Sequence, residues 1–95
     1  MPLLSPEAIE EKLRHLQGWK LAGNEIVREF SFADFVQALE FVNEVGKKAE
    51  AANHHPDIDI RYNKVTLALI SHDSGGLTER DFRMAEAVNG ISTKN

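Results

Sequence analysis

Residues 50–81 read EAANHHPDIDIRYNKVTLALISHDSGGLTERD, and the rest of the chain is organised around this stretch. Apolar and polar residues alternate over 58–62 and again over 65–69, which is the pattern of two half-buried strands. Asn63 and Lys64 lie between the two runs and are suited to a tight turn. The stretch therefore predicts a β-hairpin.

Helices are predicted on both sides of this hairpin. A residue before proline is pushed towards extended geometry, so the preceding helix must end ahead of His55 and Pro56. That helix is predicted over about 33–52, with Ser31 or Asp34 as its cap. After the hairpin, residues 78–81 have the form of a capping box and predict the start of a last helix.

The helix predicted over 33–52 has one apolar face. Gly46 lies beside that face, and glycine costs about 1 kcal/mol relative to alanine inside a helix, so we expect close packing against a neighbour there. The residues expected to face the core are Phe35, Leu39, Val42, Val45 and Ala49.

The N-terminal half repeats the same kinds of signal. Ser5, followed by proline and glutamate, predicts a helix start, and Gly18 is placed to end that helix. Residues 19–21 and 26–30 indicate two short strands joined by a turn at Gly23 and Asn24. The element order is therefore αββαββα. It predicts an α+β two-layer sandwich, in which a four-stranded antiparallel sheet carries three helices on one face.

Length and composition limit what the chain can be. Its 95 residues are expected to form a single domain over 1–95. No apolar run approaches the roughly 20 residues that cross a bilayer, so no membrane association is expected. A net charge of −4 argues against direct binding of nucleic acid. The absence of cysteine and of a signal-peptide pattern predicts a cytoplasmic location.

Three of the four histidines lie in the central stretch: His54, His55 and His72. Imidazole has an unperturbed pKa close to neutral pH, so such a cluster is suited to proton transfer. It is also suited to metal binding, because Glu50 and His54 stand four residues apart at a helix end and could share one face.

The spacing of the polar residues points to a family. Glu50, His54-His55-Pro56, Tyr62, His72 and Asp81 stand at intervals that resemble the signature of the pterin-4a-carbinolamine dehydratases. The resemblance extends over about 13–88. It implies the same αββαββα fold and a hydro-lyase that converts 4a-hydroxytetrahydrobiopterin to quinonoid dihydropterin and water, in tetrahydrobiopterin recycling. It further implies no cofactor and no metal, a pterin as the small-molecule partner, and a homodimer or homotetramer.

Roles for individual residues follow from the same resemblance. His54 and His72 are assigned to proton transfer and His55 to catalysis and pterin orientation, although the histidines could exchange the acid and base roles. Asp81 would support a histidine, but the helix pattern alone makes it the capping partner of Thr78. The expected substrate-binding residues are Glu50, His55, Pro56 and Arg80.

Two rival hypotheses remain open. One is a metal-dependent hydrolase that uses Glu50 and His54 as ligands, with His55, His72 or Asp81 as further ligands. The other is a non-catalytic dimerisation or binding module of the same fold, with a hydroxylase or regulator as a possible protein partner. The complete set of three histidines favours catalysis over the binding module.

Overall fold

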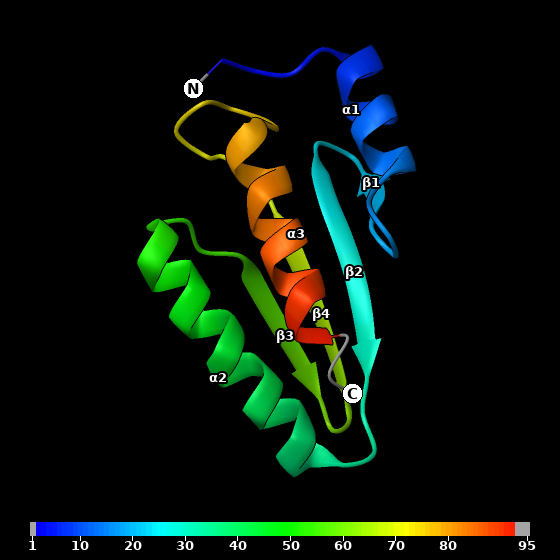
Figure 1. The fold of residues 1–95 in the computed structure, drawn as a ribbon, viewed down its shortest axis with the longest axis vertical. Coiled ribbons are helices and arrows are strands. Elements are labelled where there is room, and N and C mark those ends of the chain that lie inside the picture. Colours follow the sequence, from blue (N-terminus) through cyan, green and yellow to red (C-terminus); the bar gives the residue numbers. More distant parts are fainter. Residues whose placement is uncertain (1, 93–95) are drawn as a thin grey trace.

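The predicted hairpin is present in a computed structural model of the chain, which describes residues 2–92 (Figure 1). Strands β3 (Asp57–Arg61) and β4 (Lys64–Leu69) pair antiparallel, with Ile58 opposite Leu67. The turn lies one residue earlier than predicted, at Tyr62 and Asn63. The prediction was wrong because Asn63 is anchored to the end of the neighbouring strand, where its side-chain amide donates to the Phe32 carbonyl at 2.9 Å.

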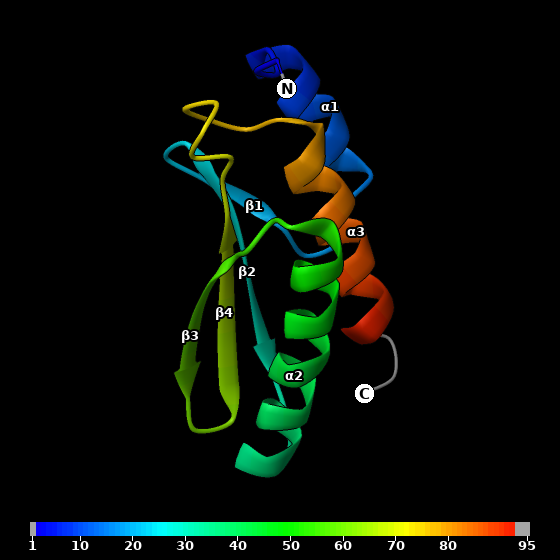
Figure 2. The same ribbon diagram turned by 90° about the vertical axis from the view of Figure 1, so that its left-hand side faces the viewer.

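The sheet and its three helices match the predicted architecture. Strands β1 (Lys20–Ala22) and β2 (Glu25–Ser31) form the first hairpin, and the sheet order is β1-β2-β4-β3, antiparallel throughout. Figure 2 shows the helices together on one face of the sheet. They are α1 (Pro6–Arg14), α2 (Phe35–Ala52) and α3 (Glu79–Ser92). The predicted αββαββα two-layer sandwich is confirmed.

The core lies between the sheet and the helices. On the sheet side, Ile26, Val65, Leu67 and Leu69 are fully buried. A side chain of this size stabilises the fold by about 1.5–3 kcal/mol when it is fully buried. On the helix side, the Phe41 ring packs 4.7 Å from the Phe30 ring and 5.0 Å from the Phe32 ring, measured between centroids.

The buried face of α2 differs from the predicted one. Phe35 and Leu39 keep 43% and 37% of their surface exposed, whereas Phe41 is buried. Gly46 has open space where a side chain would lie, so the expected close packing there was wrong. The helix is apolar on more than one side. Phe41 lies on the buried side, where it packs against the rings of Phe30 and Phe32. The residues of α2 that are buried are Ala38, Phe41, Val45 and Ala49.

Short polar contacts fix where the first two helices begin. The Ser5 hydroxyl accepts a hydrogen bond from the Ala8 amide at 3.1 Å and caps α1 as predicted. Asp34, rather than Ser31, caps α2 by accepting from the Gln37 amide at 2.9 Å. None of the helices within residues 2–92 is long and apolar enough to cross a membrane.

Candidate functional site

The way in which α2 ends brings His54 into a buried position. Asn53 adopts a left-handed conformation with φ of +51°, and the His54 amide donates back to the Ala49 carbonyl at 3.1 Å. This is the hydrogen bond of a Schellman-type helix end, and Pro56 cannot continue the helix. The chain therefore turns inward, and His54 is only 8% exposed.

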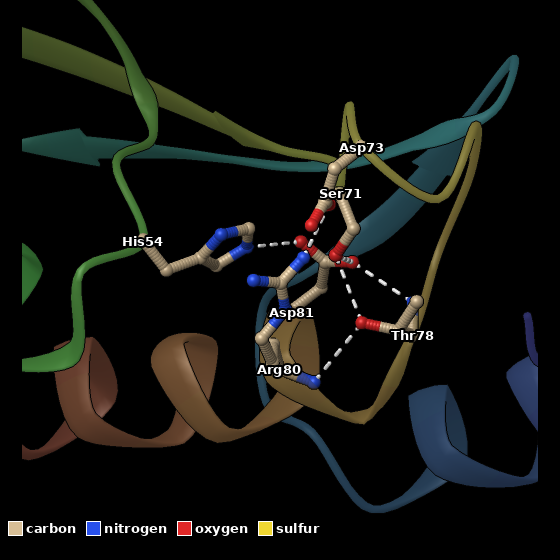
Figure 3. Close-up of polar contacts among 6 residues, drawn as sticks. All are labelled: His54, Ser71, Asp73, Thr78, Arg80 and Asp81. Carbon is tan, nitrogen blue, oxygen red and sulfur yellow. Dashed lines mark hydrogen bonds and ion pairs between the residues drawn. The ribbon is translucent and has the colours of Figure 1, made fainter. Parts of the chain in front are cut away.

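His54 meets Asp81 from the first turn of α3 (Figure 3). The His54 Nε2 atom lies 2.6 Å from Asp81 Oδ1, and Asp81 is fully buried. A buried carboxylate needs partners for both oxygens. Asp81 Oδ2 accepts from the Ser71 hydroxyl at 2.8 Å and from the Thr78 amide at 2.9 Å. Asp81 therefore makes both contacts that were considered for it: one with the Thr78 amide at the helix start and one with a histidine.

Ser71 was not predicted as a site residue. The fully buried positions of β4 are Val65, Leu67 and Leu69, and Ser71 continues that series by two residues. A polar side chain at a core-facing position must find a hydrogen-bond partner, so the alternation itself carried the signal. Ser71 is fully buried, and its hydroxyl also lies 2.8 Å from that of Thr78.

His55 forms a second and separate pair. Its Nε2 atom lies 2.5 Å from Glu50 Oε2, and both side chains are largely exposed. Glu50 belongs to the last turns of α2 and His55 follows that helix, so the pair lies at the surface beside the buried His54. A contact between two exposed side chains contributes little to stability, so a bound molecule could rearrange it at low cost.

His72 and Pro56 lie at the margins of this region. His72 follows Ser71 directly, in the turn that a bridge between Ser71 and Gly76 closes. The His72 side chain is exposed, and no hydrogen bond joins it to His54 within residues 2–92. Pro56 is partly buried and precedes β3. The structure thus brings the His72 backbone next to the Asp81 network, while its imidazole faces solvent.

Arg80 connects the network to the surface. Its guanidinium Nη2 lies 2.5 Å from Asp73 Oδ1, and this hydrogen bond lowers the pKa of the Asp73 carboxyl. The Arg80 amide donates to the Thr78 hydroxyl at 3.2 Å. Arg80 Nε is buried and has no hydrogen-bond partner among the described residues.

A pocket of about 480 Å³ opens between α3 and the segment that ends α2. Its walls are Ala52, His54, Arg80, Arg83, Met84 and Ala87. A larger pocket of about 630 Å³ is lined mainly by apolar residues of the N-terminal segment and α1, and it contains none of the predicted site residues. The pocket of about 480 Å³ reaches the buried His54.

The histidines and carboxylates divide into pairs rather than one cluster. His54 contacts Asp81 and His55 contacts Glu50. Across residues 2–92 the structure groups no three His, Cys, Asp or Glu side chains in a way that could hold a metal ion. The region around the end of α2 thus offers two imidazole–carboxylate pairs, which can accept, hold and donate protons.

Comparisons with known proteins agree on one family. The family profile described as pterin 4 alpha carbinolamine dehydratase matches residues 2–91. A protein of Acidobacterium capsulatum, whose name assigns it provisionally to these dehydratases, is 58% identical over 91 residues, which are 96% of this chain and 99% of that protein. A protein of Chloroflexus aurantiacus with the same provisional name is 56% identical and covers 96% of this chain and 98% of its own length.

Solved structures share the fold. A transcriptional coactivator/pterin dehydratase from Brucella melitensis superposes with a TM-score of 0.91 at 36% identity, over 95% of this chain and 98% of the other. A pterin dehydratase-like protein identified as a RuBisCO assembly factor in the alpha-carboxysome gives a TM-score of 0.70 at 21% identity, over 82% and 93% of the two chains. The second likeness concerns the fold alone.

Proposed function

The chain belongs to the pterin-4-alpha-carbinolamine dehydratase family, and from that premise we propose that it dehydrates 4a-hydroxytetrahydrobiopterin to quinonoid dihydropterin. The observation that carries the proposal is the buried contact of 2.6 Å between His54 Nε2 and Asp81 Oδ1, at the wall of a pocket. A histidine held by a buried carboxylate is suited to general acid–base catalysis near neutral pH.

The reaction needs two proton movements. The hydroxyl on C4a must gain a proton to leave as water, and N5 must lose one as the C4a–N5 double bond forms. His54 serves one of these transfers and His72 the other, and either residue can take either role. Because the reaction requires no change in oxidation state, acid and base groups of the protein suffice in this proposal.

The remaining predicted residues bind and orient the pterin. Glu50 and His55 present a carboxylate and an imidazole at the surface, beside the buried His54. A pterin edge carries both hydrogen-bond donors and acceptors, so it can replace the contact between Glu50 and His55 by hydrogen bonds of its own. Pro56 fixes the chain between His55 and β3. Arg80 lines the same pocket as His54 and contacts the outer part of the substrate.

Stopped-flow dehydration of freshly generated carbinolamine tests the proposal directly. The wild-type chain should accelerate the reaction over its spontaneous rate. His72→Ala should fold and lose about 10²–10⁴-fold of that acceleration, which is the usual contribution of general acid–base catalysis.

His15→Ala is the matched control, because His15 is exposed and pairs only with Glu11 of α1 within the described residues. It should leave the rate unchanged. Equal rates for the two variants would refute the assignment of His72. A wild-type chain with no acceleration at all would instead favour the non-catalytic binding module.

Association between copies of the chain is part of the proposal. Strand β3 lies at the edge of the sheet, where Ile58 is 40% exposed, and Figure 1 shows α2 on the β3 side of the molecule. An edge strand presents unpaired backbone N–H and C=O groups, to which a second strand can pair. We expect a homodimer or homotetramer joined there, in the cytoplasm.

Light scattering coupled to gel filtration tests this arrangement. Ile58→Lys should reduce the mass to that of one chain or weaken the oligomer strongly. Leu21→Lys, at a comparably exposed apolar residue of the opposite edge strand β1, should leave the oligomer intact. The reverse result would place the interface at β1.

A further inference from the structure

Two buried hydroxyl groups lie behind the pair formed by His54 and Asp81. Ser71 and Thr78 are both fully buried, and their hydroxyl oxygens lie 2.8 Å apart. Ser71 comes from the end of the sheet and Thr78 from the residue before α3, and Figure 3 shows both beside the Asp81 carboxylate. Neither residue has a role in the proton transfers proposed above.

The direction of each hydrogen bond follows from the number of protons available. The Arg80 amide donates to the Thr78 hydroxyl oxygen, and the Ser71 hydroxyl spends its one proton on Asp81 Oδ2. The proton shared between the two hydroxyl groups must therefore come from Thr78. In this series of hydrogen bonds, each group donates towards Asp81. Because Ser71, Thr78 and Asp81 are buried, water does not compete for these hydrogen bonds.

With these hydrogen-bond directions, Asp81 Oδ1 is the oxygen left to accept from His54. Oδ2 already accepts from the Ser71 hydroxyl and the Thr78 amide, whereas Oδ1 faces His54. A carboxylate can only accept, so His54 Nε2 must carry the proton between them. In the neutral ring the free lone pair is then on Nδ1, which takes no part in the contacts drawn in Figure 3.

We propose that Ser71 and Thr78 are positioning residues, which hold Asp81 so that His54 keeps its proton on Nε2 and exchanges protons with substrate through Nδ1. The catalytic consequence rests on the proposed dehydratase function, whereas the tautomer of His54 does not. The same division of labour, with a hydrogen-bonded carboxylate fixing the working nitrogen of a histidine, operates in hydrolytic triads.

The experiment combines nitrogen-15 NMR of the His54 ring with dehydration kinetics. Ser71→Ala and Thr78→Val each interrupt the hydroxyl chain, from opposite ends, so the inference does not depend on one variant folding. Ser31→Ala and Thr66→Val are matched controls, because Ser31 on β2 and Thr66 on β4 both lie away from the network. NMR spectra are recorded at a pH high enough for the ring to be neutral.

In the wild type the spectra should show the proton on Nε2. Both network variants should populate the Nδ1–H tautomer and lower kcat with little change in KM. Ser71→Ala should lower kcat by about 10- to 100-fold, which corresponds to one lost hydrogen bond to a charged group. Thr78→Val removes hydrogen bonds to neutral groups only and should lower kcat by about 2- to 10-fold. Thr78→Ser keeps the hydroxyl and should restore the Nε2–H tautomer and most of kcat. The controls should match the wild type in both measurements.

Three outcomes would overturn the inference: a wild-type ring with its proton on Nδ1, network variants with unchanged tautomer and kcat, or a Thr78→Ser variant as impaired as Thr78→Val. A shifted tautomer in a chain that has no dehydratase activity would support the positioning role and refute the proposed function. The two proposals can therefore fail separately.

Discussion

The side chain of Asn89 in the last turn of α3 ties together segments that are far apart in the sequence. Its Oδ1 atom accepts from Trp19 Nε1 at 2.8 Å and from Arg28 Nη1 at 2.7 Å. Its Nδ2 atom donates to the Gln17 carbonyl at 3.0 Å. We expect Asn89→Ala to destabilise the fold far more than a typical surface substitution does.

The magnitude follows from what each partner loses. Trp19 is buried, and its indole N–H would lose the acceptor at Asn89. Arg28 would lose one acceptor but keep the Gln17 carbonyl at 2.9 Å. A buried donor left without a partner costs about 1–3 kcal/mol, and a weakened bond to a charged group adds to this. The expected loss in the free energy of unfolding is about 2–4 kcal/mol, a large part of the roughly 5–15 kcal/mol typical of a domain.

Urea unfolding followed by the fluorescence of Trp19, the one tryptophan of the chain, measures this loss. Asn43→Ala is the control, because Asn43 is an exposed residue of α2 and the same change of residue type cancels the difference in helix propensity. Trp19→Phe completes a double-mutant cycle, since it removes the indole donor.

The cycle isolates the contact between the two side chains. In the Trp19→Phe background, followed by circular dichroism, Asn89→Ala should cost at least about 0.5–1 kcal/mol less than it does in the wild type. Equal losses for Asn89→Ala and Asn43→Ala, or a coupling energy near zero, would refute the reasoning.

Further predictions concern the ends of other elements. Gly18 has φ of +85°, and a Cβ there would lie 2.4 Å from Arg28 Nε, so Gly18→Ala should lower the free energy of unfolding by at least about 1 kcal/mol in urea titrations; a neutral effect would contradict the assigned conformation. Asp34→Ala removes the cap of α2 and should cost about 1 kcal/mol in the same assay, with no loss expected if the helix began elsewhere. Arg80 lowers the pKa of Asp73 below its ordinary 3.8, so their contact stabilises the fold above that pH and the contribution disappears as pH falls through the lower folded value. The stability difference between wild type and Asp73→Asn should therefore shrink in acid, and a difference that grows would have the wrong sign.

The elements could be predicted because their signals are local. Alternation over a few residues indicates a strand, and Ser5 or the run at 78–81 marks a helix start wherever the rest of the chain lies. A contact between Asp81 and a histidine was also expected, through the spacing of a family signature, but the sequence did not indicate that the histidine would be His54. The turn at Tyr62 and Asn63 was misplaced because its position depends on the contact between Asn63 and Phe32, which follows strand β2.

The parts that could not be predicted depend on how layers meet. Helix α2 carries apolar residues on more than one side, and Phe41 lies on the buried side, where its ring packs against those of Phe30 and Phe32. Trp19 and Asn89 stand 70 residues apart, and nothing near either one indicates the other. By contrast, Ser71 was predictable in principle, since it continues the buried series of β4.

Asp81 shows why stability and function are hard to separate in this chain. One oxygen caps α3 through the Thr78 amide and the other contacts His54, so replacing Asp81 by an apolar residue removes both contacts together. Loss of activity in such a variant would be equally well explained by a disordered helix start. The Ser71 hydroxyl contacts the Asp81 carboxylate and the Thr78 hydroxyl, but among the described residues it makes no hydrogen bond to the backbone of the first turn of α3. Substitution of Ser71 therefore distinguishes the positioning of the histidine from the capping of the helix.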